Sequence, residues 1–481
     1  MGLTRGLVFK SFFWKYSERF IVQVFNFVLT ILLARLLSPN EYGIVALIMV
    51  FVNIANVIVE GGLNTALIQR KNADESDFST TFFFCIIVSF IMYAIMYFCA
   101  PLISSFYHND ELVPVIRILS LLLILYAINS IQQAYIAKKM LFRKLFICSI
   151  ISIIVSGVVG VLLAYRGLGV WALVSQLLIN HIVLIIMMFF LISWRPSFFF
   201  SIRKLIPLLD FGWKIFLSNL IVAVFVNMRK LVIGRVFTAS SLAFFEKGEQ
   251  FPNIIMNNIN SSVQAVLLPT FSEYQNDRDA IKRMLYRATT LSCFFIYPLL
   301  IYLIVVAKPL VVLILTEKWA PAALFLQILA IACFFRPVTL ANLEAIKAMG
   351  YSDVFLKLEI VKKIVDIIIL FISVLLGVYA IAWGVVLYDL VCVILNLYPN
   401  KRLLNYGIWE QVKDVMPILL ISLFTGGIVF FVQFLQLPSF VTIVLQLLLG
   451  LTIYMTLCLI FKEKSFVYIL SIIRTKRNLR S

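Results

Sequence analysis

The sequence predicts an all-α polytopic membrane protein with about fourteen transmembrane helices. Three observations predict this fold class: the composition, the long apolar runs, and the alternation of Lys and Arg between successive loops. Of the 481 residues, 63% are hydrophobic and 13% are charged. Soluble chains are roughly 45–50% apolar and 25% charged. A chain of this composition needs lipid around it.

The apolar runs give the expected helices in order, because about 20 mainly apolar residues are needed to cross a bilayer. Turn-forming residues separate the runs, as at Ser38-Pro39-Asn40 and Leu437-Pro438. The loops are short and leave no room for a soluble domain. The expected spans are 12–36, 41–64, 78–104, 112–136, 145–165, 169–193, 209–236, 240–267, 284–307, 321–347, 354–377, 379–399, 414–435 and 438–461.

The cationic residues test this order, because cytoplasmic loops collect Lys and Arg. Alternate loops are basic, as at Arg70 and Lys71 and again at Lys138 and Lys139, whereas the loops between them hold little beyond Arg166 and Lys318. We therefore expect both termini to be cytoplasmic. The formal net charge of +18 then reflects membrane topology, and no nucleic acid partner is expected.

The chain resembles itself at an offset near 200 residues. Trp14-Lys15 opens the first span and Trp213-Lys214 opens the seventh, and residues 35–43 align with residues 235–243. Because each set of six spans starts on the same side, the repeat is parallel, with two pseudo-symmetric six-helix lobes. The expected domains are an N-terminal lobe at 1–205, a C-terminal lobe at 206–402, and a C-terminal helix pair with a basic tail at 403–481.

Polar residues inside the spans are the candidate site. A charge at mid-bilayer costs roughly 2.5–3.5 kcal/mol on insertion scales, so each one is a functional candidate until it is paired. The polar residues of the first, second and eighth spans recur at three- and four-residue intervals, which places them on one face of each helix. The candidate substrate-binding residues are Arg19, Asn26, Asn56, Glu60, Asn227, Arg229, Lys230, Asn253, Asn257 and Arg336.

We expect the polar faces of spans one, two, seven and eight to meet in a central water-filled cavity between the lobes. The cations suit an anionic head group, because phosphate oxygens accept charge-assisted hydrogen bonds, and the amides suit sugar hydroxyls. The structural alternative is pairing along a helix, as for Lys362 and Asp366 or for Arg19 and Glu18. Arg229, Lys230 and Arg336 have no carboxylate at i±3 or i±4 and favour the functional interpretation.

Catalytic and metal-binding motifs are scarce. We interpret His181, alone in the sixth span, as a hydrogen-bonded structural histidine, and the seven cysteines as core packing because all lie in apolar runs. The sequence has no Walker A loop. We therefore expect no catalytic residue, no cofactor and no metal site.

Two stretches carry a family resemblance. Ala34-Arg-Leu-Leu-Ser-Pro-Asn-Glu-Tyr-Gly43, followed by Glu60-Gly-Gly-Leu-Asn-Thr-Ala-Leu-Ile-Gln-Arg70, resembles the opening of bacterial polysaccharide flippases. That family belongs to the multidrug, oligosaccharidyl-lipid and polysaccharide exporter superfamily. The motifs lie in the first 75 residues, while the span count and the duplicated halves extend the resemblance over nearly the whole chain.

The resemblance implies a transporter of the bacterial cytoplasmic membrane that is not an enzyme. It would move an undecaprenyl-diphosphate-linked oligosaccharide repeat unit from the cytoplasmic to the outer leaflet by alternating access. The product would feed O-antigen, capsule or exopolysaccharide assembly. The implied partners are the lipid-linked oligosaccharide, membrane lipid, a polysaccharide polymerase and other assembly proteins.

Two alternatives stay open at this point. A cation-coupled drug exporter of the same fold is disfavoured by the cation-rich interior, since the substrates of such exporters are usually positive. A polytopic glycosyltransferase, polymerase or ligase would need a large external loop with catalytic groups, and the expected loops are short. The sequence leaves open the sugar carried and whether Na⁺, H⁺ or the membrane potential drives transport.

Overall fold

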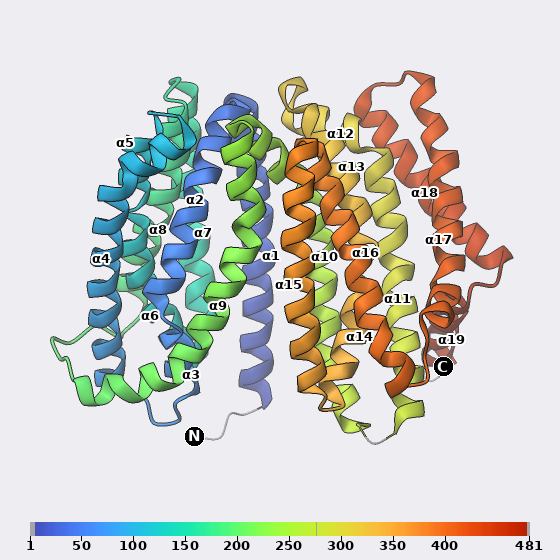
Figure 1. Cartoon of the computed structure of the whole chain (residues 1–481), viewed down its shortest axis with the longest axis horizontal. Helices are drawn as coiled ribbons and strands as arrows, with labels where there is room; N and C mark the ends of the chain where they lie inside the picture. Colours follow the sequence, from blue (N-terminus) through green and yellow to red (C-terminus); the bar gives the residue numbers. More distant parts are fainter. Residues whose placement is uncertain (1–4, 276, 479–481) are drawn as a thin grey trace. The chain divides into compact units, whose positions relative to one another are not determined.

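The computed structural model describes residues 5–275 and 277–478, and within them it contains helices and no β-strand. The chain forms two compact units, Met1–Ala243 and Phe244–Ser481. In Figure 1 the first unit runs from blue to green and the second from yellow-green to red. The predicted all-α class is confirmed.

The first unit holds nine helices of the described chain. They are α1 (Arg5–Leu36), α2 (Pro39–Glu60), α3 (Leu63–Gln69), α4 (Glu75–Tyr107), α5 (Leu112–Leu119), α6 (Leu122–Lys139), α7 (Phe142–Tyr165), α8 (Val170–Leu191) and α9 (Ile202–Val236). Helix α10 (Ala239–Glu273) begins at the end of this unit and lies mostly in the second.

The second unit continues with nine more described helices and two short 3₁₀ turns, Glu317–Trp319 and Phe431–Leu435. The helices are α11 (Arg278–Val305), α12 (Ala307–Leu315), α13 (Pro321–Cys333), α14 (Arg336–Ala348), α15 (Ser352–Leu376), α16 (Val378–Leu403), α17 (Ile408–Phe430), α18 (Ser439–Ile460) and α19 (Lys464–Asn478).

The predicted spans are present as helical segments. Twelve segments of the described chain are long and apolar enough to cross a membrane. The expected eighth and eleventh spans form α10 and α15, whose polar and charged residues set them apart from these twelve. The protein is therefore a multi-pass membrane protein, and the expected number of about fourteen is approximate.

The fourth, the tenth and the second expected spans each differ from a single helix over their whole length. The fourth is broken at Ser120-Leu121 into α5 and α6, and the tenth at Phe334-Phe335 into α13 and α14. In the second break Pro337 lies in the first turn of α14, where its missing N–H is tolerated. The second span ends early, at Glu60, because Gly61 and Gly62 take positive φ values of 53° and 71°.

Helix α2 begins where Ser38-Pro39-Asn40 predicted a boundary. The Ser38 N–H donates to Glu41 Oε2 at 2.6 Å, and the Glu41 N–H donates to Ser38 Oγ at 3.4 Å. This reciprocal pair satisfies two N–H groups that a helix start leaves without partners. Pro39 at the first position fixes φ in the helical range.

The first compact unit ends at Ala243, whereas the sequence predicted the end of the N-terminal lobe at residue 205. Helix α9 packs on α2, α3 and α4 and therefore belongs to this unit. A Cβ on Gly43 would lie 1.8 Å from the Ala239 carbonyl oxygen, and a Cβ on Gly62 would lie 2.4 Å from the Gly212 carbonyl oxygen. Glycine at both positions lets the backbones touch, which the internal repeat of the sequence could not reveal.

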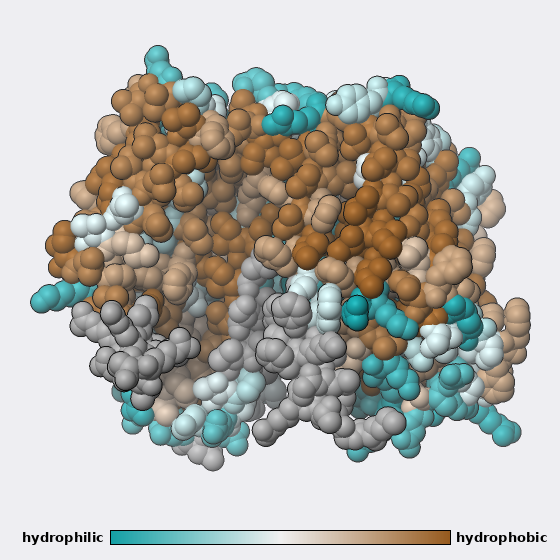
Figure 2. Space-filling model, turned by 180° about the vertical axis from the view of Figure 1, so that it is seen from behind, coloured by the Kyte–Doolittle hydropathy of each residue, from teal (hydrophilic) through white to brown (hydrophobic). Residues whose placement is uncertain are grey.

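Large apolar side chains lie on the surface as well as in the core. On the face drawn in Figure 2, hydrophobic residues form a broad band with hydrophilic residues towards its upper and lower edges. Phe98, Phe190 and Phe371 are each more than two-thirds exposed. This is the arrangement that lipid contact requires. Six of the seven cysteines are buried and Cys99 is half-buried, so their predicted packing role agrees with their burial.

Candidate functional site

The polar face of α1 comes first along the chain. Arg19 and Asn26 are exposed on this helix. The Lys15 ammonium lies 3.8 Å from Glu18 Oε2, and the Ser149 hydroxyl donates to Glu18 Oε1 at 3.3 Å. Glu18 therefore contacts Lys15 and α7 in the described part of the chain, whereas the structural alternative paired it with Arg19.

The polar face of α2 places an amide beside a carboxylate. The Asn56 Nδ2 group donates to Glu60 Oε1 at 3.0 Å, and both side chains are half-buried. Asn56 Oδ1 is buried and has no hydrogen-bond partner among the described residues. A buried acceptor without a donor is costly, so this oxygen is suited to receive a hydroxyl or a water.

The face of α9 carries the cations that the sequence singled out. Asn227 is buried and its Nδ2 group donates to the Ala223 carbonyl at 2.8 Å, so its amide turns back onto its own helix. Arg229 and Lys230 are half-buried. Because α2 and α9 pack together, the polar residues of these two helices belong to the same unit.

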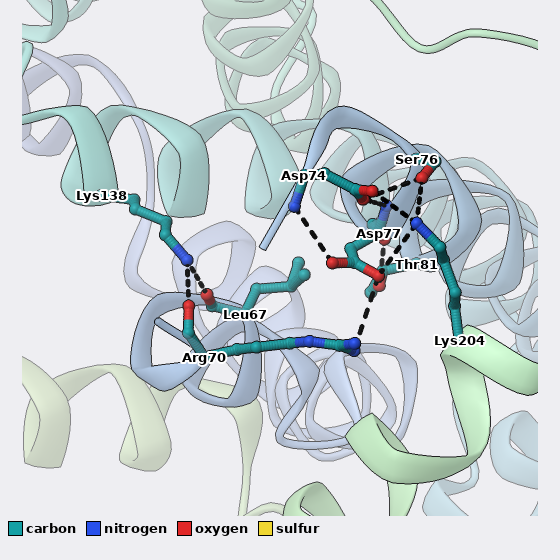
Figure 3. Close-up of polar contacts among 8 residues, drawn as sticks. All are labelled: Leu67, Arg70, Asp74, Ser76, Asp77, Thr81, Lys138 and Lys204. Carbon is teal, nitrogen blue, oxygen red and sulfur yellow. Dashed lines mark hydrogen bonds and ion pairs between the residues drawn. The ribbon is translucent and has the colours of Figure 1, made fainter. Parts of the chain in front are cut away.

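A charged cluster fixes the start of α9 (Figure 3). The Lys204 ammonium lies 2.5 Å from Asp74 Oδ2 and 3.9 Å from Asp77 Oδ1. The Arg70 guanidinium lies 3.5 Å from Asp77 Oδ1, and the Lys138 ammonium donates to the Leu67 carbonyl at 3.0 Å. The hydrogen bond from Lys204 holds the pKa of Asp74 below its ordinary value.

An aromatic anchor holds the segment that leads into α9. Trp194 is buried and stacks on Tyr135, with ring centroids 5.8 Å apart. The Ser197 N–H donates to Ser79 Oγ at 3.1 Å. Together with the Lys204 cluster these contacts tie the beginning of α9 to α4 and α6. Arg229 and Lys230 therefore extend from an anchored helix.

In the second unit Arg336 joins three helices. Its Nε group lies 3.2 Å from Asp389 Oδ2 on α16, and its Nη1 group donates to Asn253 Oδ1 on α10 at 2.9 Å. Asn253 and Arg336 are thus brought together as predicted residues of one site. Asn257, one turn further along α10, is exposed.

Asp389 is the residue that sequence reasoning missed. The absence of a carboxylate near Arg336 on its own helix suggested an unpaired cation, but the carboxylate comes from another helix. The available signal was Asp389 itself, a charge inside the expected span 379–399. Because a charge inside a membrane span is costly, the carboxylate of Asp389 needs a cationic partner. The role of Arg336 in substrate binding stays a prediction.

Two further residues that the sequence singled out are Lys362 and His181. Lys362 pairs with Glu359, one helical turn before it, and its predicted pairing with Asp366 stays a prediction. Asn129 Nδ2 and His181 Nδ1 are 3.2 Å apart, and the ring of Tyr126 meets that of His181 edge-on at 4.7 Å. His181 is the predicted structural histidine. Within the described chain no group of His, Cys, Asp and Glu could hold a metal ion.

Within the first unit, the candidate residues are of types that bind anions and hydroxyl groups. The first unit offers an exposed cation at Arg19, half-buried cations on α9, and acceptors at Asn56 and Glu60. Guanidinium and ammonium groups in an apolar surrounding bind phosphate oxygens strongly. Amides and carboxylates accept hydrogen bonds from hydroxyl groups.

Two solved structures are similar to this chain in fold. The lipid II flippase MurJ in an inward closed conformation matches with a TM-score of 0.74 at 18% identity, covering 93% of this chain and 98% of MurJ. An inward-facing multidrug resistance MATE family transporter of the MOP superfamily matches with a TM-score of 0.61 at 16% identity, covering 79% of this chain and 94% of that chain. Both show the fold that the sequence predicted.

Two relatives are similar to this chain in sequence. The succinoglycan biosynthesis transport protein ExoT of Rhizobium meliloti is 26% identical over 64% of this chain, and this match covers 62% of ExoT, less than two thirds of its length. The teichuronic acid biosynthesis protein TuaB of Bacillus subtilis is 25% identical over 71% of each chain. A family model described as polysaccharide biosynthesis protein matches residues 32–324, more than half of the sequence, and the chain therefore belongs to that family.

Proposed function

We propose that this protein flips a polyprenyl diphosphate-linked oligosaccharide from the cytoplasmic to the outer leaflet of a bacterial cytoplasmic membrane. Undecaprenyl diphosphate is the proposed carrier, and the product feeds assembly of a surface polysaccharide such as O-antigen, capsule or exopolysaccharide. Membership of the polysaccharide biosynthesis protein family and the MurJ-like fold support this proposal. The names of ExoT and TuaB support a polymer made of sugar units.

The observation that carries the proposal is the pair of half-buried cations on α9. Arg229 and Lys230 lie inside a membrane-spanning segment, where ionisable residues are rare and mark substrate or ion pathways. Guanidinium and ammonium groups suit a diphosphate, and the amide and carboxylate of Asn56 and Glu60 supply acceptors for sugar hydroxyls. A substrate that is cationic would be repelled by the same surface, which disfavours drug export.

The proposed cycle needs no bound cofactor. Translocation is driven by a Na⁺ or H⁺ gradient or by the membrane potential, and both termini are proposed to be cytoplasmic. A polysaccharide polymerase is the proposed consumer of the flipped lipid. Alternating exposure of one site to the two sides is the proposed mechanism, since parallel duplicated halves permit it.

A cell-based experiment tests the function. Deletion of the gene in its own host should abolish one surface polysaccharide and leave its lipid-linked intermediate in the cytoplasmic leaflet, and a plasmid copy should restore both. Accumulation of unlinked sugar nucleotides without the lipid-linked intermediate would instead indicate a glycosyltransferase and would contradict the proposal.

A further inference from the structure

Basic side chains gather where α11 begins in the second unit. Two adjoining pockets there share Tyr286 and Arg287. One has a volume of about 520 Å³ and the other about 190 Å³. The charged residues that line them are Lys282, Arg283, Arg287, Glu410, Lys413, Asp414 and Lys464.

The acids of this basic cluster are already engaged. The Lys282 ammonium lies 3.2 Å from Glu410 Oε2, and the Tyr406 hydroxyl donates to Asp414 Oδ2 at 2.6 Å. The neighbouring carboxylate, Glu463, accepts the Phe466 N–H at 2.8 Å. With five lining cations and two lining acids, the cluster retains a formal excess of three positive charges.

Two of the cations, Arg287 and Lys464, are held in place by aromatic rings. The Arg287 guanidinium lies over the Tyr468 ring at 5.1 Å, and the Lys464 ammonium lies over the Tyr286 ring at 5.9 Å. A cation over an aromatic face is attracted by the ring quadrupole and keeps its charge. Arg283, Arg287 and Lys464 are all exposed, so an anion can reach them.

An apolar groove lies further along α11 than the cluster. Arg283, Arg287, Leu291, Phe295 and Leu299 follow at four-residue intervals and form one continuous ridge, which winds around the helix by about 40° at each step. The first two line the basic pockets, Leu291 lines the smaller one, and the last two line a groove of about 170 Å³ that α11 forms with α17 and α18.

The groove is open towards the surface of the unit. Phe295, Leu447 and Leu451 line it and are about half-exposed. On α17, Gly426 permits the approach to α11, since a Cβ there would lie 2.2 Å from Ile301 Cγ2. An apolar groove on a membrane-spanning segment, with cationic pockets about one turn before it on the same helix, matches a lipid whose chain lies along α11 and whose phosphate meets the cluster.

The level of the cluster agrees with a head-group position. Trp409, at the start of α17, is 78% exposed, and an exposed indole prefers the membrane interface. Helix α19, which carries Lys464 and Tyr468, follows α18 directly. The alternation of Lys and Arg assigns this end of the unit to the cytoplasmic side, where anionic lipids are concentrated.

We propose that this basic cluster and the adjoining groove form a binding site for an anionic membrane phospholipid. The phosphate binds Arg283 and Arg287, Lys413 and Lys464 surround it, and one acyl chain lies between α11 and α18. The site is separate from the cations of α9 and does not depend on which substrate the protein transports. Basic pockets between transmembrane helices on the cytoplasmic side recognise lipid phosphates in this way.

The test uses the full-length protein in a neutral detergent. Binding of phosphatidylglycerol with brominated acyl chains is measured by quenching of tryptophan fluorescence and, independently, by native mass spectrometry. The double variant Arg283→Gln/Arg287→Gln should bind phosphatidylglycerol about 10- to 30-fold more weakly than the unmodified protein, while phosphatidylcholine binding should be the same in both.

Matched variants keep the result interpretable. Lys401→Gln/Arg402→Gln removes two exposed charges from the end of α16, outside both pockets, and should leave phosphatidylglycerol affinity unchanged. Leu451→Trp fills the groove without changing charge and should also weaken binding. Equal affinity of the Arg283→Gln/Arg287→Gln protein and the unmodified one would overturn the site.

A competition arm identifies the source of the phosphate. Undecaprenyl diphosphate is added to the protein loaded with brominated phosphatidylglycerol. Retention of phosphatidylglycerol supports a membrane phospholipid as occupant. Displacement at equimolar polyprenyl lipid would assign the site to the transport substrate and would overturn the proposal as stated.

Discussion

At the scale of single residues, the α9 cations are the part of the site most open to test. Replacing Arg229 or Lys230 by Ala should lower polysaccharide output about tenfold or more at unchanged membrane abundance, because charge-assisted hydrogen bonds contribute about 1.5–3 kcal/mol. Arg229→Lys should restore it only in part, since an ammonium cannot form a bidentate contact. Polymer output normalised to protein level measures the effect.

The control for that prediction is Arg166→Ala, an exposed arginine in the loop before α8. It should leave output unchanged. Full output from both α9 variants would rule out a cationic site on α9, and the proposed flipping reaction would then need another anion-binding surface.

Arg336 requires a different design because it is already paired with Asp389. Asp389→Asn should lower the melting temperature of the purified protein, since it leaves a half-buried guanidinium without this counter-charge. The double variant Arg336→Met/Asp389→Leu removes both charges and should recover much of the melting temperature.

Transport by the double variant separates the two roles of Arg336. If the arginine only joins α10, α14 and α16, the double variant should transport as well as its stability allows. If it binds the substrate, transport should fall even where the melting temperature recovers. The predicted result is loss of transport, as the sequence-based assignment of Arg336 requires.

At the scale of helices, two close backbone contacts, one in α2 and one directly before α3, depend on glycine. Gly43→Ala and Gly62→Ala should each lower the melting temperature, because the added methyl meets a backbone carbonyl that cannot move away easily. Overpacking of this kind typically costs about 1–3 kcal/mol. Thermal melting in detergent is the measurement.

Gly427→Ala supplies the comparison, since a Cβ at that position of α17 meets nothing within 4 Å. It should be neutral or slightly stabilising, because Ala favours a helix interior over Gly. Equal melting temperatures for Gly43→Ala and Gly427→Ala would contradict the contact between Gly43 and Ala239.

The helices also show what the sequence could and could not reveal. Turn chemistry at Ser38-Pro39 marked the start of α2 because capping is local. The break at Ser120-Leu121 left no mark, since the apolar run continues through it, and α19 was taken for part of a basic tail. The Arg336–Asp389 pair spans two helices, and spacing along one helix carries no information on such a contact.

At the scale of the whole molecule, topology is the prediction that the basic loops make. In a variant without the seven native cysteines, single cysteines at Asn40, His108 and Lys318 should react with an impermeant maleimide added outside intact cells. Cysteines at Asn72 and Lys401 should react only after permeabilisation. External labelling at Lys401 would overturn the span order and the parallel repeat.

The central claim is that the protein moves a lipid-linked diphosphate sugar between leaflets, and purified protein in vesicles tests it most directly. A labelled undecaprenyl diphosphate oligosaccharide is placed in both leaflets, and an impermeant glycosidase added outside reports the accessible fraction. With the protein present, nearly all label should become accessible, whereas protein-free vesicles and vesicles with Arg229→Ala/Lys230→Ala should stay near one half. An accessible fraction near one half with active, correctly inserted protein would contradict the account.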